Sequence, residues 1–212
     1  MTETPFWYRV LWVMGMIIFK FLFDLRIEGV EKIPSKGAMV IVANHRSYLD
    51  PIVLALVTPR KMNFMAKEEL FKNPVFGFLI KKLGAFPLKR EKPDRKAYIK
   101  ALSVLKEGKI LSLFPEGTRS ISGKIGNLKE GSVRIALHSR VPIFPVVIKG
   151  TGEVLPPGKK MIRGGRIKVK VGDPIFTDSF SKEEERQVAK KIIDKIETVS
   201  YTHLTLPTTP YV

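Results

Sequence analysis

The segment AMVIVANHRSYLD, residues 38–50, joins an apolar run to a cluster of polar and charged side chains. Residues 38–43 predict a β-strand, and Asn44, His45 and Arg46 follow it at once. Two later runs, 110–114 and 143–148, have little polar alternation, which is typical of strands buried on both faces of a parallel or mixed sheet. Sites in α/β proteins form at strand ends, so the residues after Ala43 are the first candidates for a functional site.

Strands and helices alternate along most of the chain. Further strands are predicted at residues 25–28, 63–66, 84–88 and 166–171, and helices at residues 51–57, 67–82, 94–107, 130–140 and 181–198. Pro74 interrupts the second of these helices, with Asn73 as its expected end, and Gly108 stands where a helix C-cap is needed. The alternation predicts an α/β fold with a central, mostly parallel or mixed sheet flanked by helices.

The most apolar stretch lies near the N-terminus, at residues 6–23. As a helix it would rise roughly 27 Å, slightly less than the thickness of a bilayer core. Trp7, Tyr8 and Trp12 beside Arg9 suit the water–lipid interface. We therefore expect residues 1–24 to form a membrane-associating helix, which holds the protein on the cytoplasmic face of the cell membrane as a monotopic or peripheral protein. A buried core helix and a cleaved signal peptide are the alternatives.

The other end of the chain has a different character. Residues 199–209 read VSYTHLTLPTT, an uncharged run that resembles the in-frame translation of a transposon-type sequencing adapter. We expect residues 199–212 to be a non-native tail in which His203 has no role; an ordinary extended tail is the alternative. Residues 25–198 then form the α/β domain.

Charge and composition narrow the possible partners. The 212 residues include 37 Lys and Arg against 20 Asp and Glu, a net charge of +17. Such a surplus indicates a polyanionic partner, either nucleic acid or anionic lipid. The absence of cysteine excludes disulfides, a cysteine nucleophile and thiolate metal sites. With only three histidines, we expect no metal centre.

His45 and Asp50 are the candidates for proton transfer. A histidine titrates near neutrality and can act as a general base. A carboxylate a few residues later can accept the hydrogen of the other ring nitrogen, which fixes the tautomer. Since no serine nucleophile is obvious, the histidine would activate a substrate hydroxyl directly. The structural alternative is that Asp50 and Pro51 form the N-cap and first residue of the following helix.

The segment FPEGTRS, residues 114–120, follows another predicted strand. Gly117 lets the backbone approach a ligand closely, and Arg119 offers a planar fork suited to phosphate. A surface turn with a solvated charge is the alternative. A Walker A loop is excluded because five residues separate Gly117 from Gly123, and Ile125 stands where Ser or Thr is required.

Two further blocks complete the set. The first is GAFPLKR, residues 84–90, whose two final cations either hold a phosphate or are simply solvated. The second is VPIFPV, residues 141–146, which has no reactive group and is expected to shape an apolar wall.

These four blocks, in this order over residues 45–146, resemble the four motifs of the glycerolipid acyltransferase family, of the lysophosphatidic acid acyltransferase type. The resemblance implies that His45 is the general base and Asp50 its partner. It also implies a set of residues that bind the acyl acceptor, chiefly its phosphate: Lys67, Arg90, Glu116, Gly117, Thr118 and Arg119. The tripeptide 87–89 departs from the usual residues, which leaves the role of Lys89 open.

The implied reaction moves a fatty acyl group from acyl-CoA or acyl-carrier protein to the sn-2 hydroxyl of 1-acyl-glycerol-3-phosphate, giving phosphatidic acid for phospholipid synthesis. The donor is a substrate, and no metal or other cofactor is implied. Backbone N–H groups near Gly117 are the expected donors to the tetrahedral oxyanion. The first alternative is a relative that acylates glycerol-3-phosphate or another lysolipid. The distant alternative is a non-catalytic basic protein that binds membrane or nucleic acid. Because no nucleic-acid-binding motif is recognisable, we expect an anionic membrane surface as partner and no nucleic acid.

Overall fold

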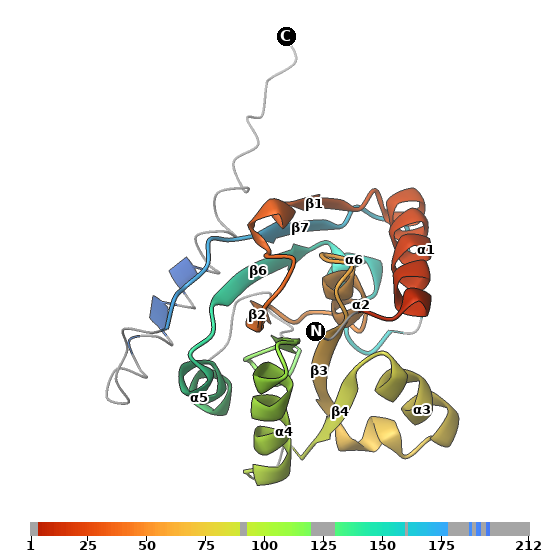
Figure 1. The fold of residues 1–212 in the computed structure, drawn as a ribbon. Helices are drawn as coiled ribbons and strands as arrows, with labels where there is room; N and C mark the ends of the chain where they lie inside the picture. Colours follow the sequence, from red (N-terminus) through yellow and green to blue (C-terminus); the bar gives the residue numbers. More distant parts are fainter. Residues whose placement is uncertain are drawn as a thin grey trace.

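The computed structural model describes residues 4–89, 93–119, 130–159 and 161–177, together with residues 187, 190, 191, 194 and 195 (Figure 1). Its sheet consists of β1 (Arg26–Glu28), β2 (Met39–Ala43), β3 (Met62–Lys67), β4 (Ala85–Leu88), β5 (Ile110–Leu113), β6 (Ile143–Lys149) and β7 (Lys168–Val171). The helices are α1 (Phe6–Phe23), α2 (Asp50–Ala55), α3 (Pro74–Lys82), α4 (Arg95–Lys106), α5 (Glu130–Ser139) and α6 (Thr151–Val154), with two 3-10 turns, η1 (Val30–Lys32) and η2 (Glu68–Phe71).

The sheet has the strand order β1-β7-β6-β2-β5-β3-β4. Strand β2 pairs in parallel with β5 and β6, β3 pairs in parallel with β5 and β4, and only β7 runs antiparallel to its neighbour β6 within this part of the chain. The predicted, mostly parallel or mixed sheet is therefore confirmed. The carboxyl ends of β2 to β6 all lie at one edge, called the carboxyl edge below, with β2 near its middle.

Alternate residues of β2 point to opposite sides of the sheet, as in any strand. Met39, Ile41 and Ala43 pack in a cluster with side chains of α1 and α2, whereas Val40 and Val42 pack with α4 and α5. The crossovers from β2 to β3 and from β3 to β4 step in the same direction through the sheet. Right-handed connections therefore place α3 on the same side as α2, and Figure 1 shows this arrangement. This side is called the α1 face, and the other the α4 face.

Helix α1 lies on the sheet with most of its surface outward. By length and composition it is the one helix in the described residues that could cross a membrane, and 17% of it is buried. The alternative of a buried core helix is therefore wrong. Tyr8, Phe19 and Phe23 face inward, and the Trp12 indole donates to the carbonyl of Leu56 at 3.0 Å.

The helix predicted at residues 67–82 is wrong in its first half. Lys67 belongs to β3, and η2 follows it. Asn73, expected to end a helix, instead begins α3, because its side chain accepts from the Phe76 N–H at 3.0 Å and Pro74 follows. An Asn before a Pro is the preferred start of a helix. The expected C-cap after α4 is confirmed, since Gly108 has a φ of 74°.

Other predicted elements shift by a few residues at their ends. Of the predicted helix at 181–198, residues 187, 190, 191, 194 and 195 are described and are helical. The remainder of that helix and the expected tail at 199–212 lie outside the described residues, so the division of the chain into 1–24, 25–198 and 199–212 stays a prediction.

Gly150 links β6 to α6 with a φ of 88°. A Cβ at this position would collide with the carbonyl oxygen of Arg166. We expect Gly150→Ala to lower the free energy of unfolding by about 3 kcal/mol or more, because the left-handed conformation and the collision each destabilise the folded state. Gly158→Ala is the matched control: its φ is 79°, nothing lies within 4 Å, and the expected loss is about 1 kcal/mol. Equal losses in urea unfolding would contradict this packing.

Candidate active site

His45 and Glu116 meet at the carboxyl edge of the sheet. His45 lies two residues beyond β2 and Glu116 three residues beyond β5. The two strands are parallel neighbours, with Val42 opposite Leu113. Residues 71 positions apart therefore come into contact, and the Glu116 Oε1 accepts from the His45 backbone N–H at 3.2 Å.

One oxygen of Asp50 organises the turn after β2. Its Oδ2 accepts from the backbone N–H groups of Arg46 and Ser47, both at 2.6 Å, and lies 2.9 Å from the His45 Nδ1. The side chains of His45 and Asp50 are 12% and 1% exposed. Backbone N–H groups only donate, so this oxygen is an acceptor. We therefore assign the hydrogen to Nδ1, which leaves the lone pair of Nε2 available in the neutral ring.

The structural alternative, in which Asp50 is the N-cap of the following helix, is wrong. Helix α2 begins with Asp50 itself, and the N-cap position is Leu49, without a side-chain hydrogen bond. The carboxylate turns back toward the preceding turn, where the N–H groups of Arg46 and Ser47 and the imidazole of His45 bond its Oδ2. Its other oxygen, Oδ1, is buried without a partner in the described part of the chain.

Residues beside His45 that the sequence did not single out hold this turn in place. The Ser47 hydroxyl donates to the Leu155 carbonyl at 2.8 Å. The Asn44 side chain bonds both the carbonyl and the N–H of Ile148, at 2.9 and 2.8 Å. These bonds tie the turn to β6 and to the segment after α6. The polar character of Asn44 and Ser47 was the only sequence signal for this role. Their partners could not be identified from the sequence, because they lie more than a hundred positions away.

The block 114–120 contributes a wall and a tight turn. The Phe114 ring stacks on the His45 imidazole with centroids 4.2 Å apart. Gly117 has a φ of 70° and donates its N–H to the Phe114 carbonyl at 3.0 Å. This N–H is therefore occupied, so Gly117 itself is not the expected oxyanion donor. Glu116 is buried and contacts the His45 backbone; its binding of the acceptor stays a prediction.

Arg119 and Tyr48 form the outer side of the site. The Arg119 guanidinium lies over the Tyr48 ring at 3.7 Å, and its Nη2 donates to the tyrosine hydroxyl at 3.0 Å. The Arg119 Nη1 is buried without a partner in the described residues. The guanidinium is thus held in place with one donor nitrogen available. Tyr48, an aromatic residue inside the His–Asp block, was missed from the sequence.

The remaining predicted acceptor-binding residues are more loosely placed. Lys67 ends β3 at the same edge, where its Nζ lies 3.0 Å from the Glu69 carboxylate. Thr118 is exposed, and Arg90 lies outside the described residues. Two further polar atoms near the turn, the Arg46 Nε and the Thr151 Oγ1, are buried without a partner in the part of the chain that is described. Unsatisfied buried groups of this kind are candidates for contacts with a ligand.

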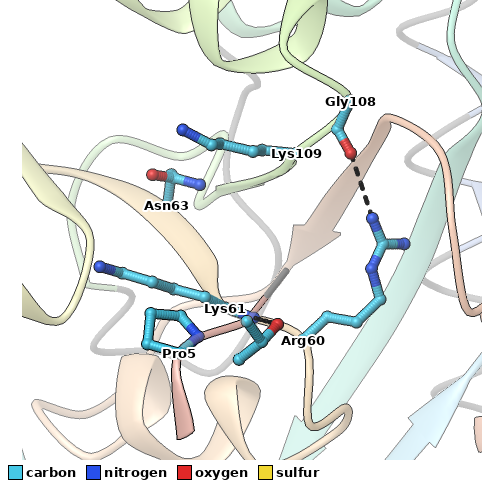
Figure 2. A pocket seen from close by; sticks show the side chains of 7 residues that line it. Pro5, Arg60, Lys61, Asn63, Gly108 and Lys109 are labelled. Atoms are coloured by element: carbon cyan, nitrogen blue, oxygen red, sulfur yellow. Dashed lines mark hydrogen bonds between the residues drawn. The ribbon is translucent and has the colours of Figure 1, made fainter. Parts of the chain in front are cut away.

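A cavity of about 270 Å³ lies elsewhere, at the opposite edge of the sheet (Figure 2). Lys61 and Lys109, which line it, directly precede β3 and β5. Arg60 is used structurally, since it donates to the carbonyls of Pro34, Gly37 and Gly108. Burial, and then the charge of Lys109, lower the pKa of Lys61. This cavity is remote from His45 and is not the site of proton transfer.

Comparison with known proteins identifies the class. Residues 24–149 match the sequence model of the family described as Acyltransferase. The chain belongs to the acyltransferase family, which confirms the resemblance carried by the four blocks.

Its relatives narrow the class to one kind of acyltransferase. The 1-acyl-sn-glycerol-3-phosphate acyltransferase of Bacillus subtilis is 32% identical over 158 residues, which cover 74% of this chain and 76% of that protein. The protein of the same name from Streptococcus pneumoniae is 33% identical, with 81% of this chain and 62% of the relative covered. The chloroplast enzyme LPAT1 of Arabidopsis thaliana is 31% identical, and the chain spans about half of its length, 49%.

A solved structure agrees with this assignment. The crystal structure of the 1-acyl-sn-glycerophosphate (LPA) acyltransferase, PlsC, from Thermotoga maritima superposes with a TM-score of 0.77 at 34% identity. The superposition covers 92% of this chain and 80% of that chain.

Substitutions of Glu116 test whether its contact with the His45 backbone positions the imidazole. We expect Glu116→Ala to lower acyl-transfer kcat by roughly ten- to a hundred-fold, because the His45 N–H loses its acceptor and a displaced base is costly. Glu116→Gln keeps an acceptor oxygen and should lose only a few-fold. Glu107→Ala, an exposed acidic residue after α4, is the control and should match the parent. Full activity of Glu116→Ala would contradict the positioning role.

Proposed function

We propose that the chain transfers a fatty acyl group from acyl-CoA or acyl-carrier protein to the sn-2 hydroxyl of 1-acyl-glycerol-3-phosphate. The observation that carries the proposal is the buried pair of His45 and Asp50, whose geometry leaves the imidazole Nε2 available as a base. The names of the relatives support the choice of 1-acyl-glycerol-3-phosphate as the acyl acceptor. The product, phosphatidic acid, would enter phospholipid synthesis.

The reaction proceeds by direct transfer. His45 Nε2 takes the proton of the acceptor hydroxyl while the oxygen attacks the thioester carbonyl. The tetrahedral intermediate collapses, the C–S bond breaks, and the leaving sulfur takes the proton back from the imidazolium. Asp50 stabilises the imidazolium and keeps the ring in place. General base catalysis of this kind is worth about 10²–10⁴-fold. The mechanism needs no metal or cofactor.

The acceptor phosphate is proposed to bind the basic side of the site. Arg119 is fixed on Tyr48, its Nη1 has no partner among the described residues, and Lys67 lies at the same edge. Arg90, Gly117 and Thr118 join them by resemblance to the family. A guanidinium that is already ordered loses little entropy when it binds a phosphate.

The proposed location is the cytoplasmic face of the cell membrane. The outward apolar surface of α1 and the net charge of +17 both suit an anionic lipid surface. In this account residues 1–24 are the anchor and residues 25–198 the catalytic domain. No nucleic acid is required to explain the positive charge, because acceptor, donor and membrane are all anionic.

The direct test incubates purified protein in detergent or vesicles with lysophosphatidic acid and labelled acyl-CoA. We expect the parent to make labelled phosphatidic acid and His45→Ala to lose at least about 100-fold in rate. His138→Ala is the matched control, since His138 lies on α5 and contacts Tyr98. If the parent is inactive with acyl-CoA, acyl-carrier protein, glycerol-3-phosphate and other lysolipids follow as substrates. An active parent matched by His45→Ala would disprove the proposed base.

Arg119→Lys tests the phosphate site. Lysine keeps the charge but lacks the planar fork and the stacking on Tyr48. We expect the KM for lysophosphatidic acid to rise about ten-fold, with kcat changed only a few-fold. Tyr48→Phe keeps the ring beneath the guanidinium and should have a smaller effect. A fall in kcat at unchanged KM would place Arg119 in the chemical step instead.

A further inference from the structure

Helix α3 exposes a contiguous group of large apolar side chains. Val75 is 79% exposed and Phe78 63%, and Phe76 and Leu79 are also exposed. Single exposed apolar residues are ordinary on soluble proteins, but a gathered patch on one short helix indicates a binding surface. We call these four residues the α3 patch. Figure 1 shows α3 at the periphery of the molecule, away from α4 and α5.

The packing of α3 fixes the patch outward. Gly77 is buried, and a Cβ there would lie 2.9 Å from the Phe71 carbonyl oxygen. The backbone of α3 therefore sits directly against η2. Ile80 and Leu83 are the half-buried side chains of this segment, so the inner side of the helix is already occupied. The patch cannot be buried by a small rotation of α3.

The patch lies on the same side of the sheet as the exposed surface of α1. The topology places α1, α2 and α3 on the α1 face. On that face α1 exposes Ile17 and Phe21, and α2 exposes Ile52. Among the described residues of α4 and α5, Ile99 is the large apolar side chain that is exposed. Among the described helices that cover the sheet, exposed apolar side chains are therefore concentrated on the side that carries the proposed membrane helix.

Lysines border the apolar residues of this face. Lys72 precedes α3, and Lys81 and Lys82 end it. The Lys82 Nζ lies 5.2 Å from the centre of the Phe78 ring. At the start of α1, the Lys61 Nζ lies 5.3 Å from the ring of Trp7.

Lysine stems can cover apolar surface while their charged ends reach the level of lipid phosphates. Glu68 and Glu69 of η2 are the nearby acids, and Glu69 is paired with Lys67. The border of the patch is therefore positively charged, as an anionic bilayer requires.

We propose that α3 is a second membrane-docking element, whose patch enters the interface of an anionic bilayer beside α1 while Lys72, Lys81 and Lys82 contact lipid phosphates. The proposal rests on the membrane association proposed for α1. A single helix on a membrane leaves the attached domain free to rotate about the helix axis. A second contact removes that rotation and sets the orientation of the carboxyl edge relative to the lipid that supplies the acceptor.

The absence of cysteine from the chain allows a clean test. Val75→Cys and, as the matched control on the α4 face, Ile99→Cys are labelled with an environment-sensitive fluorophore. Vesicles of phosphatidylcholine with phosphatidylglycerol are then added. We expect a blue shift and increased emission from position 75, with quenching by a lipid-phase quencher, and no change from position 99. No response at position 75 from vesicle-bound protein would overturn the proposal, as would an equal response at both positions.

A binding measurement separates the patch from the lysines. Val75→Ser with Phe78→Ser should lower partitioning into the mixed vesicles by about ten-fold or more. Lys81→Glu with Lys82→Glu should weaken binding by at least about ten-fold when phosphatidylglycerol is present, and far less without it. Ile99→Ser is the control and should bind like the parent, and thermal unfolding checks that each variant is folded. Unchanged partitioning of the patch variant would refute the docking role. So would loss of self-association by the patch variant with binding to vesicles unchanged, since the patch would then pair two copies of the chain.

These experiments contain no acyl donor or acceptor, so they stand even if the proposed reaction fails. Conversely, the patch variant should acylate a short-chain lysophosphatidic acid dispersed without vesicles as fast as the parent does. Loss of that activity would show damage to the site and would count against a role limited to docking.

Discussion

Asp50 Oδ2 accepts two backbone N–H groups and faces the His45 imidazole, and the rest of the site depends on this one oxygen. A buried carboxylate is costly unless it is hydrogen bonded, and here three groups of a single turn bond its Oδ2. The same bonds that stabilise the carboxylate fix the direction of the imidazole. Strand β2 delivers the turn, and β5 delivers Glu116 to hold the His45 backbone from the other side. The geometry of the proposed catalytic pair and the stability of this turn thus have the same cause.

Around this centre the molecule is divided by charge and polarity. The carboxyl edge brings together the imidazole of His45, the ordered guanidinium of Arg119 and Lys67, which suits the proposed anionic acceptor. The α1 face carries the apolar surface of α1 and of the α3 patch, bordered by lysines. The proposed reaction, with an acceptor in a bilayer and a dissolved donor, would use both surfaces, and the fold places them on adjoining sides of one sheet.

Much of the fold and of the candidate site was predictable from the sequence. The predictions that were wrong or missing have physical reasons. The apolar runs and the polar blocks after them predicted the sheet, its edge and the pair His45 and Asp50. The contact of Glu116 with His45 did not follow, because strand order depends on long-range pairing that no local pattern encodes. The contacts of Asn44 with Ile148 and of Tyr48 with Arg119 were not predicted, for the same reason. Asn73 was misjudged because an Asn before a Pro starts a helix as readily as it ends one.

Asp50 holds His45 with its hydrogen on Nδ1 and leaves Nε2 available. Nitrogen NMR of protein labelled with ¹⁵N in its histidines tests this directly, since the chain has only three. Histidine-to-glutamine variants at positions 138 and 203 assign the remaining signals to His45. In the neutral ring, we expect a protonated-type shift for Nδ1 and an unprotonated-type shift for Nε2, with mixed tautomers in Asp50→Asn. The opposite tautomer in the parent, or no change in Asp50→Asn, would contradict this assignment.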